Sequence, residues 1–372
     1  MHAVSILNPH ARDLAVVREP LRRWIERQDP ALGRVEILSL TANTGGSGQS
    51  NDTFFATVAH DGGQLDLVVR CGPADVSRAL FLDYDIPKQF RLMRALAEHS
   101  DVPVAPVRWF SEDPTLFGGP FYVMDFVAGD IPSDFPPCLT TPLIADATEE
   151  QQGRMWWSTV ETIAKIGCTD WRRAGLQWLA PTGGRSPLEH DIDSYERLLW
   201  SGRVGSPAWP EAEEAAAWLR AHRPADEPVG LLWGDVRMPN LVFRDHWVAA
   251  VLDWEMAGLG NPEADLVTFL VYQYNVERQI DPVHSRPRPP GFGSDDETVA
   301  TYEELVGRSV RHFDFYWVFA TYRYLAIAQR YYMWAIDSGA MSRDEAEHRK
   351  VTGGERVRSM MQVVHKEGGR RR

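Results

Sequence analysis

An aspartate and an asparagine stand between two apolar runs in the stretch LLWGDVRMPNLVF. Asp235 and Asn240 are separated there by four residues, and Asp253 follows thirteen residues after Asn240, behind the apolar run VAAVL. An aspartate beside a hydroxyl group can orient it and accept its proton, while an asparagine and a second aspartate can hold magnesium against nucleotide phosphates. Magnesium suits such ligands because it prefers oxygen and needs few protein contacts beside phosphate and water. The spacing therefore predicts a site for phosphate chemistry.

Three short apolar segments must position these side chains. LLW, LVF and VAAVLD read as buried strands, so each polar residue is expected at a strand end, held by packed backbone. Asp and Asn are also favoured in ordinary turns, and that interpretation needs no chemistry. Asp253, with an apolar strand of its own, favours the chemical interpretation.

Composition and charge limit the class of protein. The chain has 372 residues, 44% of them hydrophobic and 24% charged, which suits a globular protein of two lobes. A net charge of -13 disfavours a nucleic-acid partner. The first residues lack the pattern of a signal peptide and no apolar run has membrane-spanning length, so we expect no membrane partner. Cys71, Cys138 and Cys168 form no disulfide or metal pattern, which predicts a cytoplasmic setting; the oligomeric state stays open.

The first third of the chain mixes helix and strand patterns around a stretch rich in glycine, serine and asparagine, TANTGGSGQSND. The first expected helix has Leu14, Val17, Leu21, Trp24 and Ile25 on one face. Asp85 is the expected cap of the second helix, with Pro87 in its first turn. The expected elements are helix 11–28, strands 54–59 and 65–70, helix 86–99 and strand 120–127.

The character of the chain changes at Gly129. A passage rich in proline and threonine follows, and then helical stretches with most of the aromatic residues. Of the 14 tryptophans only Trp24 and Trp109 precede Gly129. We therefore expect an α+β fold of two lobes: a small β-rich lobe over 1–125 and a larger, mainly helical lobe over 126–372, with a hinge near 124–129.

The motif GDVRMPN followed by LDWE resembles the catalytic segment of the aminoglycoside phosphotransferase and choline kinase family, small-molecule kinases with a protein-kinase-like fold. The resemblance runs roughly from Leu38 to Phe269. GQSNDTF, VVRCGP, FYVMDFVAG and LDWEMAGLGNPEADL are most similar to the branch found fused to, or beside, acyl-CoA dehydrogenases. The resemblance implies that Asp235 is the catalytic base, that Asn240 and Asp253 bind Mg²⁺, and that Asp265 braces the catalytic loop.

The same resemblance implies a nucleotide site in the small lobe, for ATP or GTP. Arg70 stands where most kinases carry a phosphate-gripping lysine, and arginine can bind phosphate through two donors. The segment MDFV matches the hinge whose backbone pairs with the adenine edge. Each feature also has a plainer interpretation. The glycine-rich stretch also suits a flexible turn, Arg70 an exposed position at a strand end, and MDFV a strand that leaves the small lobe. The implied nucleotide-binding residues are Gly48, Gln49, Ser50, Asn51, Arg70, Asp125 and Val127.

Two positions depart from the family pattern. Trp233 replaces the usual histidine before Gly-Asp, and we expect its indole to pack and to donate one hydrogen bond. Gln89 stands where kinases carry the glutamate that pairs with the phosphate-gripping residue; it could hydrogen-bond Arg70, or Asp85 could replace it. Loss of that ion pair leaves an alternative open, a nucleotide-binding module with weakened catalysis.

The acceptor is expected over the helical lobe, near Asp235 and the aromatic helix 312–335. A polycationic aminoglycoside would need an acidic groove, which the net charge permits. The branch resemblance and the aromatic residues favour a hydroxylated, partly apolar metabolite such as a hydroxyacyl compound. Arg323, inside that helix, either meets an anionic group or forms an internal salt bridge, and we favour the salt bridge.

Overall fold

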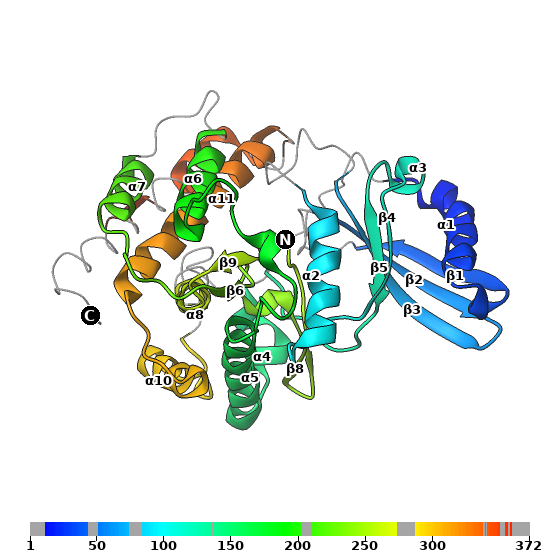
Figure 1. The fold of residues 1–372 in the computed structure, drawn as a ribbon, viewed down its shortest axis with the longest axis horizontal. Coiled ribbons are helices and arrows are strands. Elements are labelled where there is room, and N and C mark those ends of the chain that lie inside the picture. Colours follow the sequence, from blue (N-terminus) through cyan, green and yellow to red (C-terminus); the bar gives the residue numbers. More distant parts are fainter. Residues whose placement is uncertain are drawn as a thin grey trace.

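The computed structural model describes residues 12–43, 51–73, 84–134, 137–201, 210–273, 287–337, 339, 341–349, 354–355 and 358. Its two parts are a β-sheet region formed by the first third of the chain and a helical region formed by the rest (Figure 1).

A five-stranded antiparallel sheet forms the small lobe. The strand order is β1-β2-β3-β5-β4. In the β2–β3 hairpin His60 pairs with Gly63, and in the centre Arg70 of β3 lies opposite Tyr122 of β5. The strands are β1 (Val35–Ala42), β2 (Asp52–His60), β3 (Gly63–Cys71), β4 (Val107–Ser111) and β5 (Phe121–Asp125).

Two helices flank this sheet. Helix α1 (Leu14–Gln28) begins three residues later than expected because Asp13 caps it, its side chain accepting from the Ala15 N–H. Its apolar stripe packs on one face of the sheet, where Trp24 meets Phe121 at a centroid distance of 4.7 Å. Helix α2 (Ile86–His99) begins after the expected cap, Asp85, and lies between the sheet and the helical lobe (Figure 1).

The C-terminal part is mainly helical. Its short strands form two antiparallel pairs, β6 with β9 and β7 with β8. The helices are α3 (Pro114–Phe117, still among the small-lobe strands), α4 (Pro142–Ala145), α5 (Glu149–Gly167), α6 (Pro187–Ser201), α7 (Pro210–Ala221), α8 (Glu263–Val271), α10 (Asp295–Val306) and α11 (Phe313–Asp337). The strands are β6 (Gly230–Leu232), β7 (Leu241–Arg244), β8 (Trp247–Val251) and β9 (Gly258–Gly260).

The hydrophobic core joins the two regions. Its larger cluster begins on one face of the sheet with Val68 and Met124, continues through α2, and extends into the helical lobe around Trp156 and Trp233. Buried apolar area is the main stabilising contribution here, so the sheet face and α2 are fixed against the helical lobe. No helix in the described part of the chain is long and apolar enough to cross a membrane.

The expected strands agree with the structure in place but not in every end. Strand β5 ends at Asp125, two residues before the expected end at Val127. The reason is local: the Phe126 N–H still pairs with the Asp66 carbonyl at 2.9 Å, and after it the chain crosses to β7, where Asp130 and Phe243 exchange two backbone hydrogen bonds of 2.8 Å.

Candidate active site

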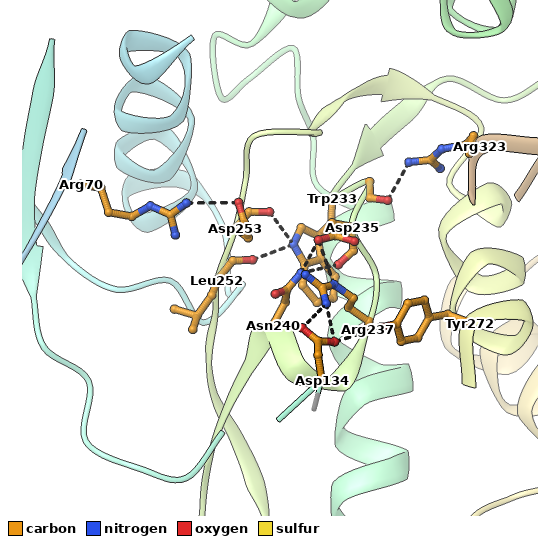
Figure 2. A network of polar contacts seen from close by, with 11 residues as sticks. Arg70, Asp134, Trp233, Asp235, Arg237, Asn240, Leu252, Asp253, Tyr272 and Arg323 are labelled. Carbon is orange, nitrogen blue, oxygen red and sulfur yellow. Dashed lines mark hydrogen bonds and ion pairs between the residues drawn. The ribbon is translucent and has the colours of Figure 1, made fainter. Parts of the chain in front are cut away.

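Asp235 and Asn240 lie on the connection between β6 and β7 and face one another. The Asn240 Nδ2 donates to the Asp235 carbonyl at 3.0 Å and to its Oδ2 at 2.6 Å (Figure 2). The single turn Met238–Asn240 brings the two residues together. Because the amide nitrogen faces Asp235, the amide oxygen of Asn240 is left for another partner.

Asp253 follows β8 and reaches the same place. The Leu252 N–H donates to the Asn240 carbonyl at 2.8 Å, which joins the two segments directly before Asp253. Asp253 itself has φ 58°, in the left-handed region that aspartate tolerates better than most residues. Strained backbone of this kind is typical of functional positions. The structure thus brings together all three side chains singled out by spacing.

Trp233 and Asp265 support the segment from behind. The indole of Trp233 is fully buried and donates to the carbonyls of Leu252 at 2.9 Å and Asp253 at 3.2 Å. The Asp265 carboxylate accepts from the backbone N–H groups of Trp233 at 2.6 Å and Gly234 at 3.2 Å. Burial raises the pKa of Asp265 to about 6, although these two N–H groups favour its ionised form. Trp233 therefore ties the Asp235 segment to the Asp253 segment, with one hydrogen bond more than expected.

Gly234, directly before Asp235, is held from a second helix. The Arg323 Nη2 on α11 donates to its carbonyl at 2.7 Å (Figure 2). Gly234 has φ 89°, and a Cβ there would lie 2.3 Å from the Met256 carbonyl oxygen, so glycine is required. The salt bridge expected for Arg323 is replaced by this bond and by the ring of Tyr195, whose centroid lies 5.0 Å from the guanidinium carbon.

Arg70 approaches the site from the small lobe. Its Nη2 lies 3.3 Å from the Asp253 Oδ1, and both side chains are nine-tenths buried. Gln89 and Asp85, the two residues expected to pair with Arg70, have other partners. The Oε1 of Gln89 accepts from the Tyr122 hydroxyl at 3.4 Å, and Asp85 accepts from the Lys88 N–H as the helix cap. The expectation that Gln89 or Asp85 pairs with Arg70 is therefore wrong: a C-lobe aspartate is within reach of the guanidinium, whereas Asp85 is committed to its helix.

Glu255 ties the small lobe to the segment after Asp253. The Asn51 Nδ2 donates to its carboxylate at 2.7 Å, and the Lys88 Nζ donates to its carbonyl at 3.0 Å. Asn51 thus lies beside the segment that follows Asp253. The other residues expected in this loop, Gly48, Gln49 and Ser50, lie outside the described residues.

The expected hinge residues lie at the end of β5. Asp125 forms an ion pair with Arg108, and its N–H donates to the Pro106 carbonyl at 2.9 Å. The N–H of Val127, which is half-buried, has no acceptor among the described residues. A free N–H at this point is a suitable donor for the edge of a nucleobase.

Three residues beside Asp235 escaped the sequence reasoning. The Arg237 Nε donates to the Asp235 Oδ2 at 3.0 Å, and its Nη1 lies 2.5 and 2.6 Å from the two Asp134 oxygens. The Tyr272 hydroxyl donates to the Asp134 Oδ1 at 3.0 Å. Arg237 could have been noticed, since it is in the same motif as Asp235. Asp134 sits in the proline-rich passage, where no sequence pattern points to it.

The donor set suits magnesium and a nucleotide. Among the described residues no group of three or more His, Cys, Asp and Glu side chains could hold a metal, so an ion here would use Asn240, Asp253, phosphate and water. The Arg70 Nε and the Asn51 Oδ1 are buried and have no hydrogen-bond partner. Buried groups of this kind normally have partners, and phosphate oxygens would supply an acceptor for the Arg70 Nε.

The family model described as the phosphotransferase enzyme family matches residues 41–293. The chain is 28% identical to the probable acyl-CoA dehydrogenase IBR3 of Arabidopsis thaliana over 338 residues, which are 87% of this chain and 40% of that protein. The chain therefore spans about two fifths of the length of that relative.

Solved structures with the same fold are known. A putative aminoglycoside phosphotransferase from Ralstonia eutropha JMP134 superposes with a TM-score of 0.68 at 23% identity, covering 93% of this chain and 96% of that one. A thermostable mutant of the aminoglycoside phosphotransferase APH(4)-Ia, in a ternary complex with ADP and hygromycin B, superposes with a TM-score of 0.53 at 15% identity, covering 91% and 98%. These likenesses confirm the expected protein-kinase-like α+β fold.

Proposed function

The chain belongs to the phosphotransferase enzyme family, and from that premise we propose that it is a kinase that transfers the γ-phosphate of ATP or GTP to a hydroxyl group of a small molecule. The expected family is confirmed, as is its branch, since a relative is a probable acyl-CoA dehydrogenase. One observation carries the proposal: Asp235 and Asn240 on the β6–β7 connection and Asp253 after β8 converge at one site with Arg70.

Asp235 is the proposed catalytic base. Its carboxylate would orient the acceptor hydroxyl and take its proton as the oxygen attacks the γ-phosphorus. Asn240, through its amide oxygen, and Asp253 would hold Mg²⁺. When bound, the ion supplies charge that stabilises the phosphate oxygens. Asp265 and Trp233 keep the base and the metal ligands in register through their backbone contacts.

The nucleotide is proposed to bind between the lobes. Arg70 would grip phosphate oxygens, with the loop residues Gly48, Gln49, Ser50 and Asn51 beside it, and the backbone of Asp125 and Val127 would pair with the nucleobase. The free Val127 N–H and the unpaired Arg70 Nε support this assignment. In this proposal the nucleotide lobe spans 1–125, the catalytic lobe spans 126–372, and the protein is cytoplasmic.

The acceptor is proposed to be a hydroxylated, partly apolar metabolite rather than an aminoglycoside. A polycation needs carboxylates that are free to bind it. Near the base, Asp134 is bound by Arg237 and Tyr272. This carboxylate already has internal partners. The name of the IBR3 relative agrees with a hydroxyacyl compound as one member of this class.

A second candidate rests on Gln89. Because a neutral side chain replaces the acid on α2, the protein could bind nucleotide without efficient turnover and signal by conformation. Thermal shift with ATP and Mg²⁺, together with ADP release over a panel of aminoglycosides, choline, macrolides and hydroxy acids, separates the two. Nucleotide binding together with ADP release for one acceptor supports the kinase. Nucleotide binding without ADP release supports the module. The absence of both binding and release supports a different function altogether.

A further inference from the structure

The Asp235 carboxylate is held through one of its two oxygens. Its Oδ2 accepts from the Asn240 Nδ2 at 2.6 Å and from the Arg237 Nε at 3.0 Å. Within the described parts of the chain no donor reaches Oδ1. The two oxygens are therefore not equivalent, and Oδ1 is the one free to meet an incoming hydroxyl group.

Arg237 is itself fixed from behind. Its Nη1 donates to both oxygens of Asp134, and Asp134 also accepts from the Tyr272 hydroxyl. The guanidinium carbon of Arg237 lies 5.8 Å from the centroid of the Tyr272 ring (Figure 2). Burial alone would lower the pKa of Arg237, but the carboxylates of Asp235 and Asp134 and the neighbouring Tyr272 raise it well above its ordinary value. The guanidinium is a permanent cation with two carboxylates on two of its edges.

Asp134 reaches this position because the segment after the hinge is tied to β7. Asp130 and Phe243 exchange two backbone hydrogen bonds of 2.8 Å, and the Arg244 side chain donates twice to the Ala128 carbonyl, at 3.1 and 3.0 Å. Residues 126–134 thus run from the end of β5 across β7 to Arg237, the residue that contacts the base.

We propose that Arg237, anchored by Asp134, is a positioning residue that holds the Oδ2 of Asp235 and so turns Oδ1 toward the acceptor. The inference rests on the proposed role of Asp235 as the base. In the reaction the hydroxyl proton passes to Oδ1, the hydroxyl oxygen bonds to the γ-phosphorus, and the bond from that phosphorus to the bridging oxygen breaks. The electron pair of that bond leaves with ADP, and Asp235 later returns its proton to water.

The shape of the side chain matters as well as its charge. Arg237 uses Nε for Asp235 and Nη1 for Asp134. Lysine has a single nitrogen and no rigid fork, so it can restore the charge but not both directed bonds. Comparison of Arg237→Lys with Arg237→Gln therefore separates geometry from charge.

The test measures ADP release from ATP and Mg²⁺, with water as acceptor and with any compound of the panel that is phosphorylated. We expect Asp134→Asn to lower kcat by about ten-fold and Arg237→Gln by on the order of 10²-fold, the loss typical of a reacting group misplaced by about 1 Å. The KM for the nucleotide should stay within about two-fold, because neither residue binds it. The kcat of Arg237→Lys should remain well below that of the wild type.

Asp295→Asn is the matched control. It removes the carboxylate from another Arg–Asp pair, the one with Arg288, remote from the base.

Two further comparisons decide the inference. The double variant of Arg237→Gln with Asp134→Asn should be no slower than Arg237→Gln alone, since Asp134 acts through Arg237. Wild-type kcat in Arg237→Lys, or additive losses in the double variant, would overturn the inference. Absence of ADP release by the wild type would instead contradict the proposed function. Crystal structures then decide: a changed Asp235 rotamer in Asp134→Asn supports the inference, and an unchanged one overturns it.

Discussion

Arg70 of the sheet and Asp253 of the helical lobe form a buried pair, with Nη2 and Oδ1 3.3 Å apart. The cation that most kinases pair with a helix glutamate is paired here with a proposed metal ligand. A nucleotide with its ion would enter between these charges, so Arg70 would exchange a carboxylate for phosphate oxygens. In this structure the carboxylate that pairs with Arg70 therefore comes from the helical lobe and not from α2.

Truncation of Arg70 tests the phosphate contact. Arg70→Ala removes one or two charge-assisted hydrogen bonds, each worth roughly 1.5–3 kcal/mol, so the dissociation constant for the nucleotide should rise ten-fold or more. Arg70→Lys should restore part of the loss, since it returns the charge without the fork. Titration at one Mg²⁺ concentration gives the order wild type, lysine, alanine. Arg22→Ala, which breaks the ion pairs with Glu19 and Glu26 on α1, is the control. Equal affinity of Arg70→Ala and wild type would make Arg70 a structural residue only.

Replacement of Asp253 tests the metal site. Asp253→Asn keeps the shape of the side chain but removes a charged oxygen ligand. The wild type should bind ATP more tightly with Mg²⁺ than with a chelator, and the variant should lose roughly ten-fold of that gain, about 1.4 kcal/mol. Calorimetry with and without the ion measures both. A variant whose affinity responds to Mg²⁺ as the wild type does would remove Asp253 from the metal site.

Removal of the Arg323 guanidinium tests the support of the catalytic loop. Arg323→Met deletes the hydrogen bond to the Gly234 carbonyl, and we expect both a loss of stability of roughly 1.5–3 kcal/mol and a lower kcat. Arg288→Met is matched, because Arg288 also donates to a glycine carbonyl, that of Gly293 at 2.9 Å, but away from the base. It should lose stability alone. If both variants keep wild-type kcat, the bond to Gly234 does not position Asp235.

Asp191 predicts a pH dependence of stability. Burial raises its pKa to about 6, and the charges of Arg323 and Lys88 only partly oppose this. Because the folded pKa is above the unfolded value of about 4, its contribution to stability is full below about pH 4 and is lost as pH rises through about 6. In Asp191→Asn no carboxyl group ionises at this position, so the variant does not lose this stability as pH rises. The free energy of unfolding of the variant, relative to wild type, should therefore rise between pH 4 and 7 in urea titrations. A flat difference for Asp191→Asn would contradict the shift.

The sequence predicted the parts of the site that lie in short motifs. Asp235, Asn240 and Asp253 were found because fixed spacing and apolar flanks place them at strand ends, and Asp265 because a resemblance covers its segment. The pairing of Arg70 with Asp253 was not predictable, since the two residues are 183 positions apart in the chain and meet only where the two lobes come together.

Contacts made by segments without a sequence motif were also not predictable. Asp134 lies in a proline-rich passage and meets Arg237 only because residues 126–134 are tied to β7. The ends of elements depended on local hydrogen bonds, as with the Asp13 cap of α1. Periodicity shows that a helix or strand exists, while caps and turns decide where it stops.

The central claim is that Asp235 is the base of a magnesium-dependent kinase, and ADP release by the wild type and by Asp235→Asn tests it most directly. With ATP, Mg²⁺ and an acceptor from the panel, the wild type should release ADP faster than without acceptor. Asp235→Asn should bind the nucleotide equally well but turn over slower by a factor on the order of 10² or more. Comparable turnover in the variant, with intact folding and nucleotide binding, would contradict the account.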